Sequence, residues 1–168
     1  ESALVVEFGR SVDPALSDRV LALDAALAAA PPEGLRELVP TYRSLMIHYD
    51  PLRLDRARLV GLVEERLGAA SADLRPGALW TIPCCYAPPH GEDLAEMAAL
   101  LGMPPERAAD LHAAARYRIY MYGFSPGFTY LGGLPEPLAI SRRARPRPPH
   151  DSKVVLVGGG LSAIASFA

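Results

Sequence analysis

The sequence predicts an α+β protein of two domains, with a boundary near residue 83. Residues 1–83 show strand-like and helix-like patterns in the order strand, helix, strand, strand, helix, strand. Residues 84–168 begin with two short helices and continue as a region rich in Gly and Pro without helical periodicity. The chain has 168 residues, 50% of them hydrophobic, which is enough for two small cores.

The first strand and the first helix have clear local signals. The run ALVVEF at residues 3–8 indicates a short buried strand. Asp13 can cap a helix that begins with Pro14, and Pro31 ends it. The apolar residues of this helix at helical spacing are Leu16, Val20, Leu23 and Leu27.

The rest of the first domain follows the same reasoning. The runs LRELVP and YRSLMIHYD, residues 35–40 and 42–50, predict two strands, and Asp55 can cap a second helix that ends at Gly68. A last strand is predicted from ALWTIPCCY, residues 78–86. This order is typical of a split βαβ sandwich, here over residues 1–83.

In the second domain the helices come first. Residues 91–115 predict two short helices separated at 102–105, and residues 116–124, RYRIYMYGF, predict a strand rich in Tyr. The run KVVLVGGG at 153–160 predicts another strand that ends in a bend. Residues 84–168 are therefore expected to form a β domain.

Composition disfavours several classes of function. The formal net charge is −2, so nucleic acid and anionic membranes are not expected partners. No apolar run approaches the roughly 20 residues of a transmembrane helix, and the first residues lack a signal peptide, which predicts a cytoplasmic protein. The two cysteines, Cys84 and Cys85, are adjacent and lack partners at metal-ligand spacing; structural thiols are therefore predicted, and no metal site.

The segment GFSPG at residues 123–127 has the letters of a serine hydrolase's nucleophile elbow. In that motif the backbone N–H after the serine joins the oxyanion hole, and a helix follows. Here Pro126 follows Ser125 and has no N–H, and the next residues are too rich in helix breakers to form a helix. We therefore predict that Ser125 is not a nucleophile, and the sequence identifies no catalytic base.

Two other features suggest ligand binding, each with a plainer alternative. The aromatic residues Phe124, Phe128 and Tyr130 lie among glycines and can line a pocket, or they can pack a surface loop into the core. Downstream, guanidinium groups able to bind carboxylate or phosphate gather within six positions, although such charge runs are usually solvated surface. They are Arg142, Arg143, Arg145 and Arg147.

Several of these segments together resemble the allophanate hydrolase subunit 1 family. The resemblance rests on YRSLMIHYDP, IPCCY, GEDLAEMAALLGM, YRIYMYGFSPGFTYLGGLPEPLAISRRARPR and the glycine cluster at 158–160. It implies an α+β N-terminal domain followed by a cyclophilin-like β-barrel. The chain departs from the family pattern at Gly160 and Leu161, where Gln-Thr is usual, and the barrel is expected to be truncated at its C-terminus.

The resemblance implies a function only within a complex. The family includes the B subunit of ATP-dependent 5-oxoprolinase, which acts with a larger cyclophilin-like subunit and a LamB/YcsF-type subunit to open 5-oxoproline to glutamate. ATP, with Mg, is then a substrate, and carboxyl transfer to urea, allophanate hydrolysis and KipI-like inhibition of a histidine kinase are the alternatives. The residues expected to bind substrate or ATP are Tyr117, Phe124, Tyr130, Gly132, Gly133, Arg142, Arg143, Arg145 and Arg147.

Overall fold

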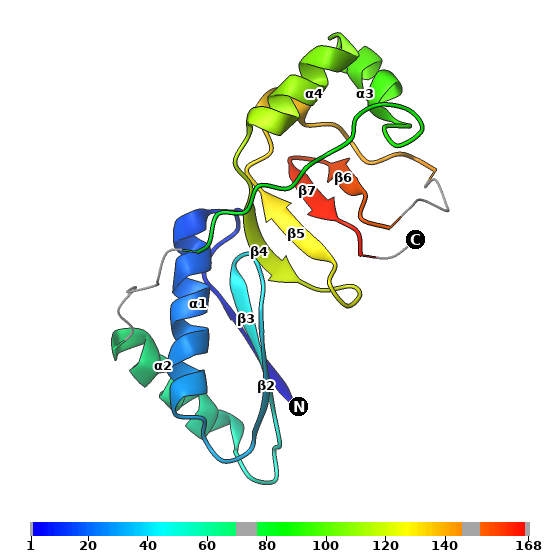
Figure 1. Ribbon diagram of the computed structural model, residues 1–168. Helices are drawn as coiled ribbons and strands as arrows, with labels where there is room; N and C mark the ends of the chain where they lie inside the picture. The colour runs from blue at the N-terminus through cyan, green and yellow to red at the C-terminus, as the bar shows by residue number, and fades with distance from the viewer. Residues whose placement is uncertain (1, 70–76, 146–151, 167–168) are drawn as a thin grey trace. The chain divides into compact units, whose positions relative to one another are not determined.

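A computed structural model describes residues 2–69, 77–145 and 152–166. The chain divides into two compact units, Glu1–Gly77 and Ala78–Ala168, each described by itself below. Both units combine antiparallel strands with two α-helices, as Figure 1 shows. The mixed α and β composition predicted from the sequence is therefore confirmed.

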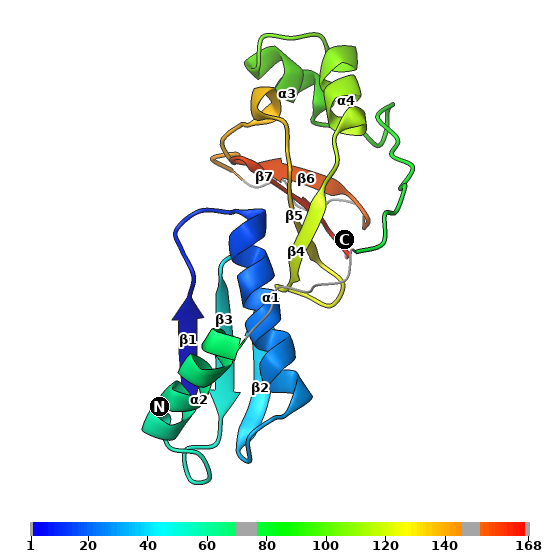
Figure 2. The ribbon, with the colours of Figure 1, turned by 90° about the vertical axis from the view of Figure 1, so that its left-hand side faces the viewer.

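The first unit is a three-stranded antiparallel sheet with two helices on one face (Figure 2). Its elements are β1 (Ala3–Glu7), α1 (Pro14–Ala29), β2 (Leu35–Pro40), β3 (Ser44–Tyr49) and α2 (Arg56–Ala69). The sheet order is β1-β3-β2, so β3 is the central strand. Its inward side chains Leu45, Ile47 and Tyr49 are buried, as the period-2 pattern predicts.

Both helices of this unit begin where the sequence predicts. Asp13 is the N-cap of α1, and its carboxylate accepts a hydrogen bond from the backbone N–H of Ala15 at 2.7 Å. Asp55 likewise accepts from the N–H of Arg58 at 2.9 Å at the start of α2. α2 continues through Gly68 to Ala69, so the prediction that Gly68 ends the helix is wrong by one residue.

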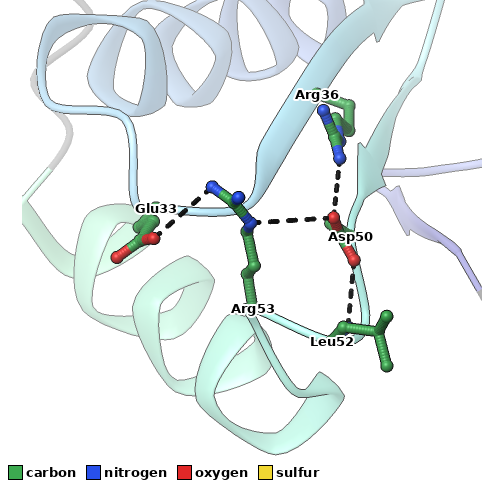
Figure 3. Close-up of polar contacts among 5 residues, drawn as sticks. All are labelled: Glu33, Arg36, Asp50, Leu52 and Arg53. Carbon is green, nitrogen blue, oxygen red and sulfur yellow. Dashed lines mark hydrogen bonds and ion pairs between the residues drawn. The ribbon is translucent and has the colours of Figure 1, made fainter.

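Asp50 organises the loop that joins β3 to α2 (Figure 3). Its carboxylate accepts from the backbone N–H of Leu52 at 3.0 Å and from Nη2 of Arg36 at 2.6 Å. Arg53 lies 4.0 Å from the same carboxylate and also pairs with Glu33 at 3.6 Å. The hydrogen bond from Leu52, followed by the bond and charge of Arg36 and the charge of Arg53, lowers the pKa of Asp50.

We expect Asp50→Asn to destabilise the protein at neutral pH, and the loss to shrink in acid. Because its pKa is lower in the folded than in the unfolded state, Asp50 contributes stability above the unfolded pKa of about 3.9. That contribution is lost as the pH falls through the folded pKa. Urea unfolding of both proteins at about pH 7 and about pH 3 measures the difference. An equal penalty at both pH values would contradict this role.

The strand predicted at residues 78–86 is not formed in the structure. Residues 77–86 have no sheet partner, and the side chains of Leu79, Trp80 and Ile82 are exposed. Apolar residues give this segment strand propensity, but a strand forms only where its backbone pairs with a neighbouring strand, which local propensity does not determine. The split βαβ arrangement of the first unit is therefore not confirmed.

The second unit opens with a pair of short helices, α3 (Leu94–Leu100) and α4 (Pro105–Ala114). α3 ends in a Schellman motif, in which Gly102, at φ +69°, donates to the carbonyl of Ala99 and Met103 donates to that of Ala98. Ala98 of α3, Ala108 of α4 and Leu138 form a small buried core with neighbouring apolar side chains. Leu138 belongs to the 3₁₀ turn η1 (Glu136–Leu138).

Four antiparallel strands form the sheet of this unit: β4 (Arg118–Tyr122), β5 (Thr129–Gly132), β6 (Val155–Gly158) and β7 (Leu161–Ile164). Their order is β4-β5-β7-β6, and β6 and β7 are joined by a tight turn at Gly159 and Gly160, which confirms the predicted bend. β7 was not predicted. The described residues form an open sheet and not a closed barrel, because the edge strands β4 and β6 do not pair with each other.

Candidate functional site

The signature segment GFSPGF forms the turn of the β4–β5 hairpin. The N–H of Ser125 donates to the carbonyl of Gly123 at 2.8 Å across Phe124, whose φ is +68°. These values describe a γ-turn with positive φ, a strained conformation for a bulky residue. The turn presents the Phe124 side chain 80% exposed, with its ring edge-on to Phe128 at 5.5 Å.

Ser125 occupies the wrong structural context for a nucleophile elbow. The residues around it join two strands, whereas the elbow requires a strand followed by a helix. Its hydroxyl lies 3.3 Å from that of Ser166, and Ser166 donates to the carbonyl of Pro126 at 2.6 Å. Among the described contacts Ser125 thus helps to hold the turn, in agreement with the prediction that it is not a nucleophile.

The glycines after the hairpin have structural reasons for lacking a side chain. A Cβ on Gly132 would lie 2.5 Å from the ring of Tyr120. Gly133 has φ +99°, and a Cβ there would lie 2.5 Å from the carbonyl oxygen of Arg116. Tyr130 packs its ring 5.0 Å from that of Phe128. The turn and β5 thus bring together the rings of Phe124, Phe128 and Tyr130, and the β4–β5 hairpin with these three rings is here called the aromatic hairpin.

The structure gives the predicted arginines different surroundings. Nη2 of Arg143 donates to Asp93 at 3.0 Å and also pairs with Glu96 on α3. Partial desolvation lowers the pKa of Arg143, but these two carboxylates outweigh it and the net shift is upward. Among the described residues no carboxylate pairs with Arg142 or Arg145, and both side chains are exposed. Arg147 lies outside the described residues.

Arg142 is held beside the β6–β7 turn. The carbonyl and N–H of Ile140 exchange hydrogen bonds with Gly159 at 2.7 and 3.3 Å, which aligns the arginine segment with the end of β6. The stem of Arg142 crosses Gly158 so closely that a Cβ there would lie 2.9 Å from its Cγ. The stem is therefore positioned while the guanidinium stays exposed, an arrangement suited to an anionic ligand.

Tyr117 belongs to a separate group, here called the His112 cluster: Cys84, Tyr86, His112 and Tyr117. Oη of Tyr86 lies 2.5 Å from Nδ1 of His112, and Tyr117 donates to the backbone carbonyl of His112 at 3.3 Å. Both phenol rings contact the imidazole, with centroid distances of 5.7 and 5.2 Å. Cys84 lies close enough to affect both hydroxyls.

Burial dominates the ionisation of the His112 cluster. It lowers the pKa of His112, so the imidazole is neutral at neutral pH. Burial, followed by the charge of Cys84, raises the pKa of Tyr117 to about 12, and the same two causes raise the pKa of Tyr86. Sequence reasoning missed this cluster, because its residues come from three separate segments and share no motif.

Within the described residues no helix is both long and apolar enough to cross a membrane. In the same part of the chain no three His, Cys, Asp or Glu side chains gather in a way that could hold a metal ion. The features described above that could contact a ligand are the aromatic hairpin, the exposed arginines and the His112 cluster.

Comparison with known proteins identifies the family. The model of a family described as carboxyltransferase domain, subdomain C and D, matches residues 1–168. The chain belongs to this family. It is 31% identical to the B subunit of 5-oxoprolinase from Bacillus subtilis (strain 168), covering 95% of this chain and 71% of the relative. It is also 31% identical to the B subunit of 5-oxoprolinase from Escherichia coli O157:H7, covering 100% and 76%. The resemblance found in the sequence is thus confirmed.

Solved structures include chains with the same fold. TTHA0988 superimposes with a TM-score of 0.83 at 37% identity over 96% of this chain, which spans 32% of that protein. Urea carboxylase of Kluyveromyces lactis gives a TM-score of 0.69 at 14% identity over 97% of this chain and 17% of its own, a likeness of fold alone.

Proposed function

We propose that this chain is the B subunit of a cytoplasmic, ATP-dependent 5-oxoprolinase that opens 5-oxoproline to glutamate. The observation that carries the proposal is its 31% identity to two proteins named as the B subunit of 5-oxoprolinase, over nearly its whole length. Those names imply that the enzyme has other subunits. For this chain the partners would be a larger cyclophilin-like subunit and a LamB/YcsF-type subunit, and it would be inactive alone.

Carboxyl transfer to urea or a similar amide is the second candidate. The family's description as a carboxyltransferase domain favours it. Both reactions act on an amide and develop negative charge on oxygen, so both call for positioned cationic and hydrogen-bonding groups. Arg142 would supply such a group here, with Arg145 close to it in the chain and the aromatic hairpin as an apolar wall.

In the 5-oxoprolinase reaction, ATP, with Mg, would bind as a substrate.

Reconstitution with the partner subunits tests the two candidates against each other. We expect ATP hydrolysis that depends on 5-oxoproline and on all subunits. Biotin-dependent carboxylation of urea, without a response to 5-oxoproline, would instead support the second candidate. Absence of both activities from a correctly assembled complex would overturn both.

Arg142 and Arg143 should behave differently when changed to Ala in the active complex. Loss of the exposed Arg142 should weaken binding of the anionic substrate by about 10- to 100-fold, since hydrogen bonds to charged groups contribute about 1.5–3 kcal/mol. Arg143, already paired with Asp93 and Glu96, should affect mainly stability. KM values and melting temperatures measure the two effects. Ser125→Ala is the matched control and should keep nearly full activity; equal KM values for both arginine variants would contradict the assignment.

A further inference from the structure

Strand β6 leaves one edge of the second sheet open (Figure 1). It is the last strand in the order β4-β5-β7-β6, and among the described residues only β7 pairs with it along its length. Edge strands are usually protected from further pairing by charged residues, Pro or a bulge within the strand. The residues of β6, Val155–Gly158, read VLVG and pair with β7 without a register shift. They carry none of these protections, so β6 is suited to accept another strand.

The hydrogen bonds around β6 show which of its backbone groups face the open edge. Gly159 exchanges hydrogen bonds with Ile140 on the outer side, at 2.7 and 3.3 Å. Val154 accepts a hydrogen bond from the residue after β7, on the inner side, at 2.9 Å. Successive residues of an antiparallel strand alternate between the two sides, so the N–H and carbonyl groups of Val155 and Val157 face outward. Within the described ranges no backbone group pairs with them.

The segment that follows Ile140 begins to cover this edge but does not continue along it. One isolated antiparallel bridge pairs Ile140 with Gly159, and the next pair in the same register would be Arg142 with Val157. That second pair is absent from the described part of the chain. Arg143 instead pairs with two carboxylates at α3, which draws the segment toward that helix. The outward groups of β6 therefore stay available.

Positive charge flanks the open edge at both ends. The stem of Arg142 lies over Gly158 at one end, and the exposed Lys153 precedes β6 at the other. From Ile140 to Gly158 the sequence has four arginines and one lysine against one aspartate. The backbone from Lys153 to Gly158 is about 17 Å long when extended. An extended segment of about six residues with a carboxylate at each end therefore matches the edge in both length and charge.

We propose that β6 binds an extended acidic segment of a partner protein by strand addition. The segment pairs its backbone with the outward groups of Val155 and Val157, and its acidic side chains meet Arg142 and Lys153. The main-chain hydrogen bonds supply affinity, and the flanking charges disfavour basic segments. Neither ATP nor 5-oxoproline takes part, so this interaction does not depend on the proposed function.

Amide hydrogen exchange in the 168-residue chain, followed by NMR, tests the edge directly. In the free chain we expect the outward amides of Val155 and Val157 to exchange rapidly. Those of Leu156 and Gly158, which face β7, should exchange slowly and serve as an internal control. The probe is the blocked hexapeptide Glu-Thr-Val-Thr-Val-Glu. At saturation it should slow exchange at Val155 and Val157 at least about 10-fold.

Two control peptides separate backbone pairing from charge. The basic hexapeptide Lys-Thr-Val-Thr-Val-Lys keeps the strand propensity and reverses the charge, so it should bind at least about 10-fold more weakly. The acidic peptide with N-methylated internal residues keeps the charge and loses its N–H donors. It should therefore leave exchange at Val155 and Val157 unchanged, because strand addition depends on main-chain hydrogen bonds.

Substitutions in the chain provide the complementary test. Val157→Pro removes an outward N–H without loss of a hydrogen bond to β7, so the acidic peptide should bind about 2- to 10-fold more weakly. Val157→Ala is the matched control and should bind the peptide nearly as well as the wild type. Lys153→Gln should weaken binding about 1.5- to 5-fold, whereas Lys153→Arg, which keeps the charge, should not. Lys153 is chosen because Arg142 is also assigned to the substrate.

Slow exchange at Val155 and Val157 in the free chain would overturn the proposal, since another part of the chain would then cover the edge. Protection that grows with protein concentration, without peptide, would assign the edge to a second copy instead. Equal protection by the acidic and the basic peptide, or none by either, would exclude an acidic partner. If Val157→Pro does not fold, the N-methylated peptide carries the test of backbone pairing.

Discussion

Gly133→Ala is expected to destabilise the protein by about 2 to 5 kcal/mol, one of the two greatest losses of stability that we predict. Two penalties act together. The backbone has φ +99°, which an L side chain rarely adopts, and the added Cβ would lie 2.5 Å from the carbonyl oxygen of Arg116. Because the obstacle is backbone and not a flexible side chain, the strand pair must shift. Urea unfolding followed by circular dichroism measures the loss.

Gly102→Ala separates the two penalties. Gly102 also has positive φ, +69°, but nothing lies within 4 Å of a Cβ built there. The Gly102→Ala variant should therefore lose only about 1–2 kcal/mol of its free energy of unfolding, which is the cost of the left-handed backbone conformation. Equal losses in the two variants would show that the contact with Arg116 has no energetic consequence.

Leu45→Ala should have a comparable effect on the first unit. Leu45 lies on the central strand β3 with none of its surface exposed, surrounded by side chains from both helices. Removing its buried methyl groups leaves a cavity, and such changes cost about 2–5 kcal/mol. The urea midpoint measures the loss of stability. Ligand binding should not change, because the residues expected to bind the ligand lie in the second unit.

Met46→Ala is the control on the same strand. Its side chain points to the opposite face and is only partly buried, between Val5 and Val39 on the neighbouring strands. Met46→Ala should lower the free energy of unfolding clearly less than Leu45→Ala does. The reason is that folding buries less apolar surface at position 46 than at position 45. If Met46→Ala lowered the free energy of unfolding more than Leu45→Ala, the outer face of this sheet would contribute more to stability than the face covered by the helices.

The three proposed ligand-binding features depend on local structure to different degrees. The γ-turn displays Phe124 at 80% exposure, and the Ile140–Gly159 bridge places Arg142, so hydrogen bonds of the backbone position both. The His112 cluster instead depends on side chains from three segments. A substitution that loosens α4 should therefore affect the cluster before it affects the hairpin.

Structural features that depend only on residues close together in the chain could be predicted from the sequence alone. Asp13, Pro14 and Asp55 begin helices because their own atoms complete the first turn. Leu45, Ile47 and Tyr49 alternate because a strand has a period of two. The lack of an N–H at Pro126 already argued against a hydrolase elbow.

Which distant groups meet became evident only in the folded chain. Strand propensity at residues 78–86 did not produce a strand in the described structure, since pairing requires a sheet edge that no local pattern specifies. The arginine run looked uniform in the sequence, yet Asp93 and Glu96 pair with Arg143, while Arg142 lies exposed over Gly158. Tyr86 and His112 came together for the same reason: contacts between residues far apart in the chain depend on how the elements pack.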